Sequence, residues 1–326
     1  MKGRSVNKNI IKSFDALKNY CELEKFKGWD PYDGLNSKVF QALKMNKIKF
    51  FRLAWIQFFK RSPINFRKLM LVEKGYNPKG LGLFLTAYCN LYKIEQRDEY
   101  LNTIHFLANK LIEVKTLGYS GSCWGYNFDW QSRLEFMPDK TPTVVATSFV
   151  GYALLDAYDV TKEKKYLNEA VSSCDFILND LNRTYTDDGM IFSYSPVDTM
   201  QVYNASLLGS KLLSRVYSYT ENKELIDAAK KSVNACCAVQ RDDGAWRFGG
   251  DKIQTWVDSF HTGFKLESIS EYQKYSKDTS YSKNIQKGLE YYEKNFFLEN
   301  GTPKYYDTKV KEHFAKVCRS KNYLLK

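Results

Sequence analysis

Hydrophobic and polar positions along this chain form a pattern that repeats about every 60 residues. An aromatic residue, a short polar turn and a new helical pattern recur at 91–101, 157–167, 216–226 and 274–283. The leading residues of the four copies are Tyr92, Tyr158, Tyr217 and Tyr275, separated by 66, 59 and 58 residues. A fixed period of this length predicts a repeat architecture in which each copy is one structural unit.

Each copy contains two predicted helices of different character. The helix before the tyrosine has apolar residues on more than one face, which is typical of a helix buried on both sides. The helix after the turn is amphipathic, with one apolar stripe formed in the second copy by Tyr166, Ala170, Cys174 and Ile177. A glycine-bearing aromatic loop closes each copy, and its Asp-Gly or Asn-Gly step predicts a tight turn or short hairpin.

This order predicts an all-α protein, an (α/α)6-type toroid in which inner helices form a ring and outer helices cover it. Four hairpins are expected over 76–307, with short aromatic β-hairpin-like loops at one mouth. N-terminal helices within 1–75 are expected at 7–25, 36–60 and 63–73, and a basic tail covers 308–326. We expect a single domain spanning 1–326, and an open solenoid is the alternative.

The inner helices are predicted to begin where aromatic loops end. Counting back from each tyrosine places these starts at Asn77–Pro78, Thr143–Val144, Tyr203–Asn204 and Phe260–His261. In an α/α toroid the inner-helix N-termini and the aromatic loops share one mouth, and helix N-termini favour anionic groups. Four distant segments are therefore expected to converge on one rim.

The loops that lead to this rim combine aromatic residues with carboxylates and amides. Aromatic rings stack on the C–H-rich faces of sugars, and polar side chains bond the hydroxyls, so a sugar is the expected ligand. The candidate substrate-binding residues are Trp29, Asp30, Tyr32, Trp124, Asn127, Gln131, Arg133, Tyr194, Gln201, Asn204, Trp246 and Trp256. Arg133 is the candidate for holding a carboxylate or phosphate. For any single aromatic residue, packing between loops is the alternative.

The candidate catalytic residues are His261, Asp258 and Asp129. His261 is one of three histidines, and it falls at the predicted rim with Asp258 three positions before it. Histidine near a carboxylate suits general acid or base chemistry. The alternative is a first-turn helix residue that bonds loop backbone. A pair of carboxylates would permit glycosidic hydrolysis.

Several classes of function are not indicated. The chain has no P-loop, dinucleotide fingerprint, G-x-S-x-G or H-E-x-x-H motif. Its seven cysteines lack metal-ligand spacing, so we expect no metal, no cofactor and a reducing cytoplasmic location. There is no secretory signal pattern and no apolar run long enough to span a membrane. A net charge of +12 fits an anionic partner such as nucleic acid, phospholipid or an acidic polysaccharide, or a lysine-rich surface. Of these partners we expect no nucleic acid.

The segment 46–68 is both basic and aromatic. It could lie on the inner membrane face as a peripheral contact. The alternative is a ring helix whose basic side chains reach solvent past an apolar stem.

The set of motifs resembles one family across 28–307. The stretches are GWDPYDGLNS, RLAWIQFFKRSPINFR, KGYNPKGLGLFL, GYSGSCWGYNFDWQSR, TPTVVATSFV, FILNDLNRT and DSFHTGFKLES. They are similar to bacterial and archaeal α/α-toroid proteins of exopolysaccharide and capsule biosynthesis, of the VpsJ type. Some members carry a δ-aminolevulinic acid dehydratase label, which nothing in this chain supports. The resemblance implies a role in making or modifying a surface glycan and implies no particular reaction.

We therefore expect a carbohydrate-active protein of surface polysaccharide biosynthesis that acts on an acidic or lipid-linked oligo- or polysaccharide. Hydrolase, lyase and epimerase chemistry remain open. One alternative is a non-catalytic glycan-binding or assembly factor at the inner membrane face. The least favoured is a terpenoid-cyclase relative, suggested by QRDDGAWRF at 240–248.

Overall fold

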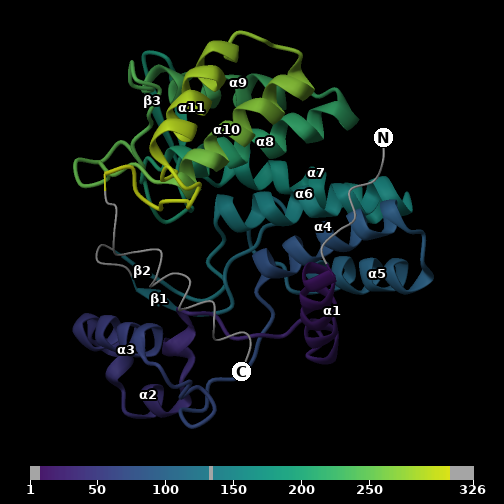
Figure 1. Cartoon of the computed structure of the whole chain (residues 1–326), viewed down its shortest axis with the longest axis vertical. Helices are drawn as coiled ribbons and strands as arrows, with labels where there is room; N and C mark the ends of the chain where they lie inside the picture. The colour runs from purple at the N-terminus through teal and green to yellow at the C-terminus, as the bar shows by residue number, and fades with distance from the viewer. Residues whose placement is uncertain (1–7, 132–134, 309–326) are drawn as a thin grey trace. The chain divides into compact units, whose positions relative to one another are not determined.

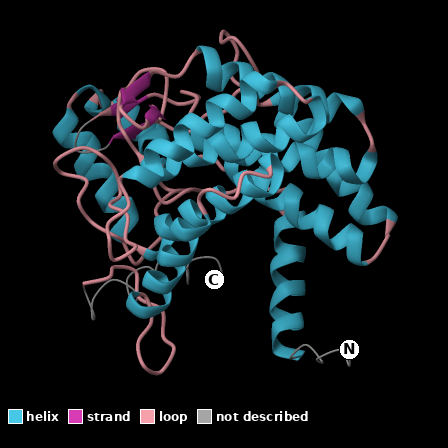
Figure 2. Cartoon of the chain, turned by 90° about the horizontal axis from the view of Figure 1, so that it is seen from above, coloured by secondary structure: helices cyan, strands magenta, loops and turns pink. Residues whose placement is uncertain are grey.

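The computed structural model describes residues 8–131 and 135–308. Helices dominate these residues, and the strands are confined to two short antiparallel pairs (Figure 2). The chain divides into two compact units, Met1–Leu81 with Tyr126–Asp139 (unit 1) and Gly82–Gly125 with Lys140–Lys326 (unit 2). The expectation of a single domain over 1–326 stays a prediction.

Four helical hairpins follow one another in the chain, and they account for the repeat (Figure 1). Each pairs an inner with an outer helix: α4 Pro78–Ile94 with α5 Asp98–Glu113, α6 Val144–Thr161 with α7 Lys164–Asn179, α8 Tyr203–Thr220 with α9 Lys223–Ala238, and α10 Ser259–Ser276 with α11 Ser282–Asn295. These helices belong to unit 2, except for the first turn of α4, which belongs to unit 1. The predicted order of inner helix, turn and outer helix is confirmed in all four copies.

The inner and outer helices differ in burial as their patterns predict. Most residues of α6 and α8 are buried on every side of the helix. In contrast, α7 buries one stripe, which includes the four predicted positions from Tyr166 to Ile177. The inner helices pack closely where small residues occur. A side-chain carbon placed on Gly151 of α6 would lie 2.8 Å from Leu212 of α8.

Three inner helices end in the same way. The residue after each helix adopts the left-handed conformation, with φ of 60° at Lys162, 56° at Glu221 and 63° at Lys277. In each case its N–H donates to the carbonyl four residues earlier, which satisfies one of the free carbonyls at the helix end. These residues form the short polar turn that the repeat contains.

The Asp-Gly step at Asp188–Gly189 forms a hairpin turn, as predicted. It joins β3 Arg183–Thr186 to β4 Gly189–Phe192, with Thr186 opposite Gly189. Gly189 has a φ of 144°, a value that favours glycine. The other strand pair, β1 Trp130–Gln131 and β2 Phe136–Met137, belongs to unit 1.

Unit 1 is less regular than predicted. It contains α1 Lys8–Leu23, the 3-10 turns η1 Asp33–Asn36 and η2 Met45–Lys47, the short α2 Lys38–Ala42, and α3 Lys49–Arg61. The expected helix over 36–60 is broken at Lys44, which adopts a left-handed conformation with φ of 55°. The expected helix over 63–73 is wrong: Pro63 disfavours helix at Ser62, where α3 has ended, and the segment after it forms bends and turns up to Leu71, which adopts a left-handed conformation with φ of 54°.

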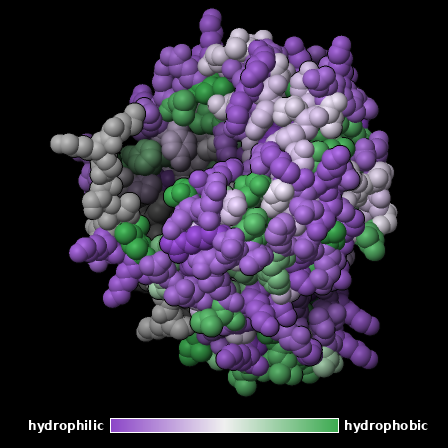
Figure 3. Space-filling model, turned by 90° about the vertical axis from the view of Figure 1, so that its right-hand side faces the viewer, coloured by the Kyte–Doolittle hydropathy of each residue, from purple (hydrophilic) through white to green (hydrophobic). Residues whose placement is uncertain are grey.

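The surface of the described residues is largely polar. Figure 3 shows a mainly hydrophilic face with scattered hydrophobic side chains. No helix in 8–131 or 135–308 is both long and apolar enough to cross a bilayer.

Candidate functional site

Aromatic loops of unit 2 return to the starts of inner helices. Three backbone hydrogen bonds mark these returns: Val144 N to Tyr194 O (3.0 Å), Gly250 N to Gln201 O (2.9 Å) and Ser259 N to Tyr305 O (2.9 Å). In each case the loop after an outer helix forms a backbone hydrogen bond with the N-terminal end of the inner helix of the same hairpin. For α8 the bonded residue, Gln201, lies just before the helix. The predicted meeting of aromatic loops and inner-helix N-termini therefore holds within unit 2.

The predicted inner-helix starts agree closely with the structure. The helices α4, α6 and α8 begin at Pro78, Val144 and Tyr203, as predicted, and α10 begins at Ser259. Helix α10 starts slightly before the predicted Phe260–His261 because Asp258 is its N-cap. One Asp258 oxygen, Oδ1, accepts from the backbone N–H of His261 at 2.8 Å.

His261 and Asp258 form a paired site at this N-terminus. The imidazole Nδ1 lies 2.7 Å from Asp258 Oδ2 and 2.9 Å from Oδ1. The Asp258 side chain is fully buried, whereas 23% of the His261 side chain is exposed. The carboxylate fixes the ring orientation and favours the tautomer with hydrogen on Nδ1. In that tautomer Nε2 is the acceptor, and it has no hydrogen-bond partner in the described part of the chain.

Asp258 is held in its ionised form by several donors. Burial alone would raise its pKa, but the hydrogen bonds and charge of His261, together with Lys265, lower the pKa below its ordinary value. Trp256 adds a further hydrogen bond from its indole N–H to Oδ2 at 3.2 Å. Lys265 is itself almost completely buried, and its ammonium donates to Arg247 O at 2.7 Å.

Two aromatic rings contact the partly exposed His261 side chain. The ring of Phe248 stacks on Trp256 at 4.4 Å and meets His261 edge-on at 4.7 Å. Phe260 contacts the imidazole from the same helix turn, with a centroid distance of 5.4 Å. Trp256 is 38% exposed, and Phe260 is also exposed, so both offer apolar surface to a ligand. The arrangement presents a proton acceptor beside aromatic surface.

The sequence interpretation missed three other groups near Asp258. Lys265 lies one helical turn after His261, and its position within the predicted inner helix gives no indication that it is near a site. The pKa values of Tyr292 and Tyr306 are raised by burial and then by the charge of Asp258. Tyr306 also forms a β-bridge with Asp258. The two tyrosines come from α11 and the loop that follows it, more than thirty residues after Asp258 in the sequence.

Other predicted binding residues of unit 2 lie on neighbouring loops and turns. Tyr194 is half-buried, and its backbone joins the start of α6. The side chain of Gln201 lies against Gly250, where an added carbon would come 2.7 Å from its Oε1. Asn204 is buried in the first turn of α8, and its Oδ1 has no partner among the described residues.

Two predicted stacking residues have a different role. Trp124 and Trp246 are completely buried, and each indole N–H donates to a backbone carbonyl, Leu111 O at 2.7 Å and Cys236 O at 2.9 Å. Both carbonyls belong to outer helices. These tryptophans anchor the aromatic loops to the core, so their faces are not available to a sugar. For these two residues the packing alternative is correct.

In unit 1, the loop around Asp30 is stabilised by internal contacts. Asp30 accepts from Tyr32 N at 2.9 Å and from the Asn77 side chain at 3.3 Å. Arg67 donates to Asp33 at 2.7 Å, yet burial outweighs this contact and raises the pKa of Asp33 to about 6.

The aromatic residues of this loop also contact neighbours. The indole N–H of Trp29 donates to Val72 O at 2.9 Å. The Tyr32 hydroxyl accepts from Lys60 at 2.7 Å.

Asp129 lines a small polar pocket within unit 1. The pocket holds about 320 Å³ and is lined by Asn36, Lys38, Gln41, Leu71, Glu73, Asp129 and Asp139. Burial raises the pKa of Asp129, although Asp139 N donates to its Oδ1 at 2.9 Å. Asn127 O accepts from Asn36 at 2.9 Å, and Gln131 accepts from Arg52 at 2.8 Å.

Arg133 lies outside the described residues. The proposed cooperation of Asp129 with His261 stays a prediction, because the two belong to different units.

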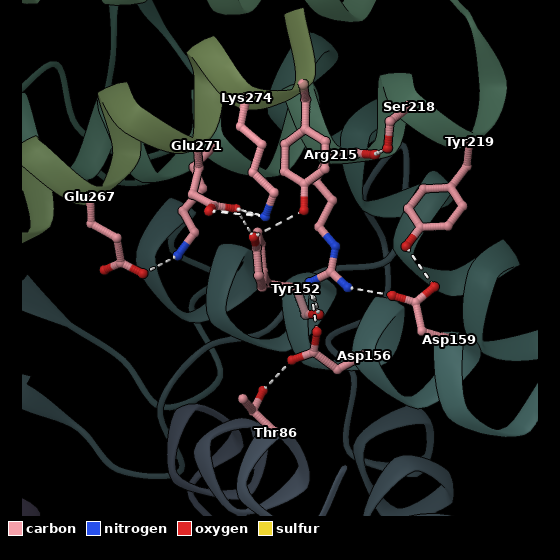
Figure 4. A network of polar contacts seen from close by, with 12 residues as sticks. Thr86, Tyr152, Asp156, Asp159, Arg215, Ser218, Tyr219, Glu267, Glu271 and Lys274 are labelled. Carbon is pink, nitrogen blue, oxygen red and sulfur yellow. Dashed lines mark hydrogen bonds and ion pairs between the residues drawn. The ribbon is translucent and has the colours of Figure 1, made fainter. Parts of the chain in front are cut away.

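A charged network further along the inner helices was not anticipated (Figure 4). The buried Arg215 of α8 bonds Asp156 at 2.7 Å and Asp159 at 2.9 Å, both on α6. The hydroxyl of Tyr152 donates to Glu271 of α10, and the Arg215 guanidinium lies 4.1 Å from the Tyr152 ring centre. The network joins α6 to α10 across α8. Because its charges are paired with one another, we infer that the network stabilises the packing of the inner helices.

The described residues contain no group of three or more His, Cys, Asp or Glu side chains arranged to hold a metal ion. The groups that the structure brings together at His261 are one oriented imidazole, a buried carboxylate, a buried ammonium and aromatic surface.

Comparison with solved structures assigns the fold class. The hairpin repeat is that of the α/α toroid, and similar chains of this class are carbohydrate-active enzymes. One is cellobiose 2-epimerase from Bacillus thermoamylovorans B4167 (TM-score 0.55, 12% identity, covering 90% of this chain and 87% of the other). Another is a GH76 α-mannanase from Bacteroides thetaiotaomicron (0.57, 16%, 70% and 64%), and a third is a polysaccharide lyase (0.56, 13%, 94% and 77%).

At these identities the likeness shows the fold alone. No protein-family model matches the chain, and no curated protein sequence matches it.

Proposed function

We propose that this chain is a carbohydrate-active enzyme whose site lies at the inner-helix N-termini of unit 2, with His261 as the proton-transfer group. The observation that carries the proposal is the His261–Asp258 pair. One edge of the imidazole is bonded to a buried carboxylate, and the partly exposed ring contacts Phe248, which stacks on Trp256. The similar folds support the substrate class, since their names describe action on cellobiose, mannan and polysaccharide.

Proton abstraction suits this geometry better than hydrolysis does. A glycosidase needs two carboxyl groups, one protonated and one able to attack the sugar or activate water. Asp258 is fully buried and already accepts from Trp256 and His261, so it cannot reach a glycosidic bond. A neutral imidazole with a free acceptor nitrogen can remove a proton from a carbon beside a carbonyl or carboxylate.

The two remaining reaction classes differ after that step. In a lyase, the electron pair left on carbon forms a double bond as the neighbouring glycosidic oxygen leaves. In an epimerase, a proton returns to the opposite face of the same carbon. The aromatic surface of Trp256 and Phe260 would hold the sugar ring, and Gln201, Asn204 and Tyr194 are proposed to contact its hydroxyls.

The finer parts of the proposal rest on the family resemblance and the charge of the chain. They are a role in surface polysaccharide biosynthesis, an acidic or lipid-linked glycan, assistance by Asp129, anion binding by Arg133, and further sugar contacts from Trp29, Asp30, Tyr32, Asn127 and Gln131. A preference for acidic over neutral polysaccharides would support the acidic substrate.

The test is incubation of the full chain in deuterium oxide with a panel of acidic and neutral polysaccharides and oligosaccharides. Mass spectrometry would detect deuterium on carbon for an epimerase, or shortened chains with an unsaturated end for a lyase. The His261→Ala variant should lose at least about a hundredfold in rate. A Lys283→Ser variant on α11 is the matched control and should retain full activity.

Three outcomes would contradict this proposal. Unchanged turnover in His261→Ala would remove the residue from catalysis. Hydrolysis without deuterium on carbon would assign the reaction to other carboxylates. Tight glycan binding with no turnover of any substrate would favour a binding or assembly factor.

A further inference from the structure

Positive charge is concentrated in one segment of unit 1. Residues 34–72 contain nine Lys and Arg residues and no Asp or Glu, in a chain whose formal net charge is +12. Two of the nine form ion pairs, Arg67 with Asp33 and Lys38 with Glu73. A third, Arg52, donates a hydrogen bond to the side chain of Gln131. A fourth, Lys60, donates to the hydroxyl of Tyr32.

The other five cations have no carboxylate near them. They are Lys44, Lys47, Lys49, Arg61 and Lys68, and all five are exposed. None has an ion-pair partner among the described residues. An excess of this kind on one segment produces a local positive field that attracts anionic surfaces.

Helix α3 has two apolar faces, and only one is covered. Its inner face packs Ile56 and Trp55 against Phe40 of the unit 1 core. Outside this face, Phe50 is 71% exposed, and Phe58, which stacks on Phe66 at 5.5 Å, is still 41% exposed. Five more large apolar side chains of this segment are more than half exposed, namely Leu43, Ile48, Ile64, Leu69 and Leu71. The segment therefore combines exposed apolar side chains with exposed cations.

We propose that unit 1 binds the surface of an anionic phospholipid bilayer through the outer face of α3. We call this the α3 surface: Phe50, Phe58, Lys49 and Arg61 of α3, together with Lys47 at the end of η2. Its apolar side chains would enter the boundary between headgroups and acyl chains, while the cations meet anionic headgroups.

Helix α3 has 13 residues and is about 20 Å long, too short to span a hydrocarbon core of about 30 Å. It would therefore lie in the plane of the membrane.

Charge complementarity favours a bilayer over a protein partner. A protein would have to combine an apolar groove with a continuous acidic border to match cations that flank both ends of the aromatic stripe. An anionic bilayer provides both features at every point of its surface. The proposal is independent of the glycan site, because it concerns vesicles that contain no glycan.

The test is co-sedimentation of the full chain with vesicles of phosphatidylcholine containing about a third phosphatidylglycerol, compared with phosphatidylcholine alone. We expect binding only to the anionic vesicles and release by high salt. The triple variant Lys47→Ser, Lys49→Ser, Arg61→Ser should lower the partition coefficient about a hundredfold, since each cation contributes roughly a factor of five. The matched control changes three exposed lysines of unit 2, Lys223→Ser, Lys283→Ser and Lys287→Ser, and should change binding by less than about tenfold.

A second pair of variants tests the apolar component. Phe50→Ser should weaken binding about tenfold or more, whereas Leu289→Ser, an exposed apolar position on α11, should not. Equal binding to neutral and anionic vesicles, or no binding to either, would overturn the proposal. So would a dimer in size-exclusion chromatography that Phe50→Ser dissociates, or salt-sensitive binding to a nucleic acid duplex in place of vesicles.

Discussion

The junctions before α6 and α10 have the same backbone role and different chemistry. Thr143 and Asp258 have similar backbone angles, and each side chain accepts from the N–H three residues ahead, at 3.1 Å and 2.8 Å. At α6 the third residue is Ala146, which needs nothing further. At α10 the third residue is His261, and the capping carboxylate also bonds its ring.

This difference separates what a helix start requires from what the α10 junction contains. A neutral hydroxyl is enough to cap α6, and α8 begins after Val202 with no side-chain cap at all. A carboxylate at Asp258, the buried Lys265 and the imidazole are therefore not required to begin an inner helix. The position of His261 follows from the repeat, but the charged groups around it do not. That excess is the reason to assign the α10 junction a function.

The largest expected effect comes from removing the N-cap of α10 and, in a separate variant, the N-cap of α6. Asp258→Ala should cost about 4 kcal/mol in the free energy of unfolding, because it leaves the Lys265 ammonium buried without a counter-charge as well as uncapping α10. Thr143→Ala should cost about 1 kcal/mol, because only a neutral cap is lost. Urea denaturation measures both, and equal costs would mean that the α10 junction is an ordinary cap.

The next effect concerns pH and Lys265. Burial lowers the pKa of this ammonium from 10.5 to about 8, although Asp258 opposes the shift. Between these values the unfolded chain binds more protons than the folded chain, so stability should rise with pH from about 8 to 10.5. The gain is at most about 3 kcal/mol. Unfolding followed across this range should show the rise in the wild type and not in Lys265→Met. A rise that persists in the variant would assign it to another group.

A smaller effect tests whether Asp258 orients the imidazole. In a Lys265→Met background, where no buried ammonium needs a counter-charge, Asp258→Thr gives α10 the cap that α6 has. We expect little change in the unfolding midpoint and a loss in turnover of about tenfold or more, because His261 loses the carboxylate that holds its ring. The pH dependence of turnover should shift as well. Unchanged turnover and pH profile would reduce Asp258 to a cap.

The smallest effect concerns the aromatic surface. Trp256→Ala should weaken glycan binding by about threefold to tenfold, because it removes partly exposed ring surface next to His261. Tyr185→Ala, an exposed aromatic on β3, is the matched control and should leave binding unchanged. Isothermal titration with an oligosaccharide measures both. Equal losses in the two variants would indicate non-specific contact.

The fold was largely predictable because local patterns determine it. The small and apolar residues of α6 and α8 are compatible only with helices buried on both sides, and the tyrosine spacing placed the inner helices within two residues. The errors lie in unit 1, where the left-handed residues Lys44 and Leu71 fall inside the segments 36–60 and 63–73 that apolar spacing predicts as helices.

The site was predictable only in part. His261 and Asp258 were found because they are three residues apart on one predicted turn. The prediction for Trp124 and Trp246 is wrong, because a tryptophan in a glycine-containing loop has the same local sequence whether it faces a ligand or the core. Arg215 was overlooked, because its partners Asp156 and Asp159 are more than fifty residues away.

The sequence by itself determined the repeat, the helix starts and the presence of a histidine at one junction, because these depend on residues within a few turns of each other. Tertiary structure decided which groups became partners. It buried Asp258 and Lys265 together, exposed one edge of His261, and placed two tryptophans in the core. The physical reason is that burial and charge pairing depend on groups brought together from distant parts of the chain, and their distances appear only when the hairpins pack.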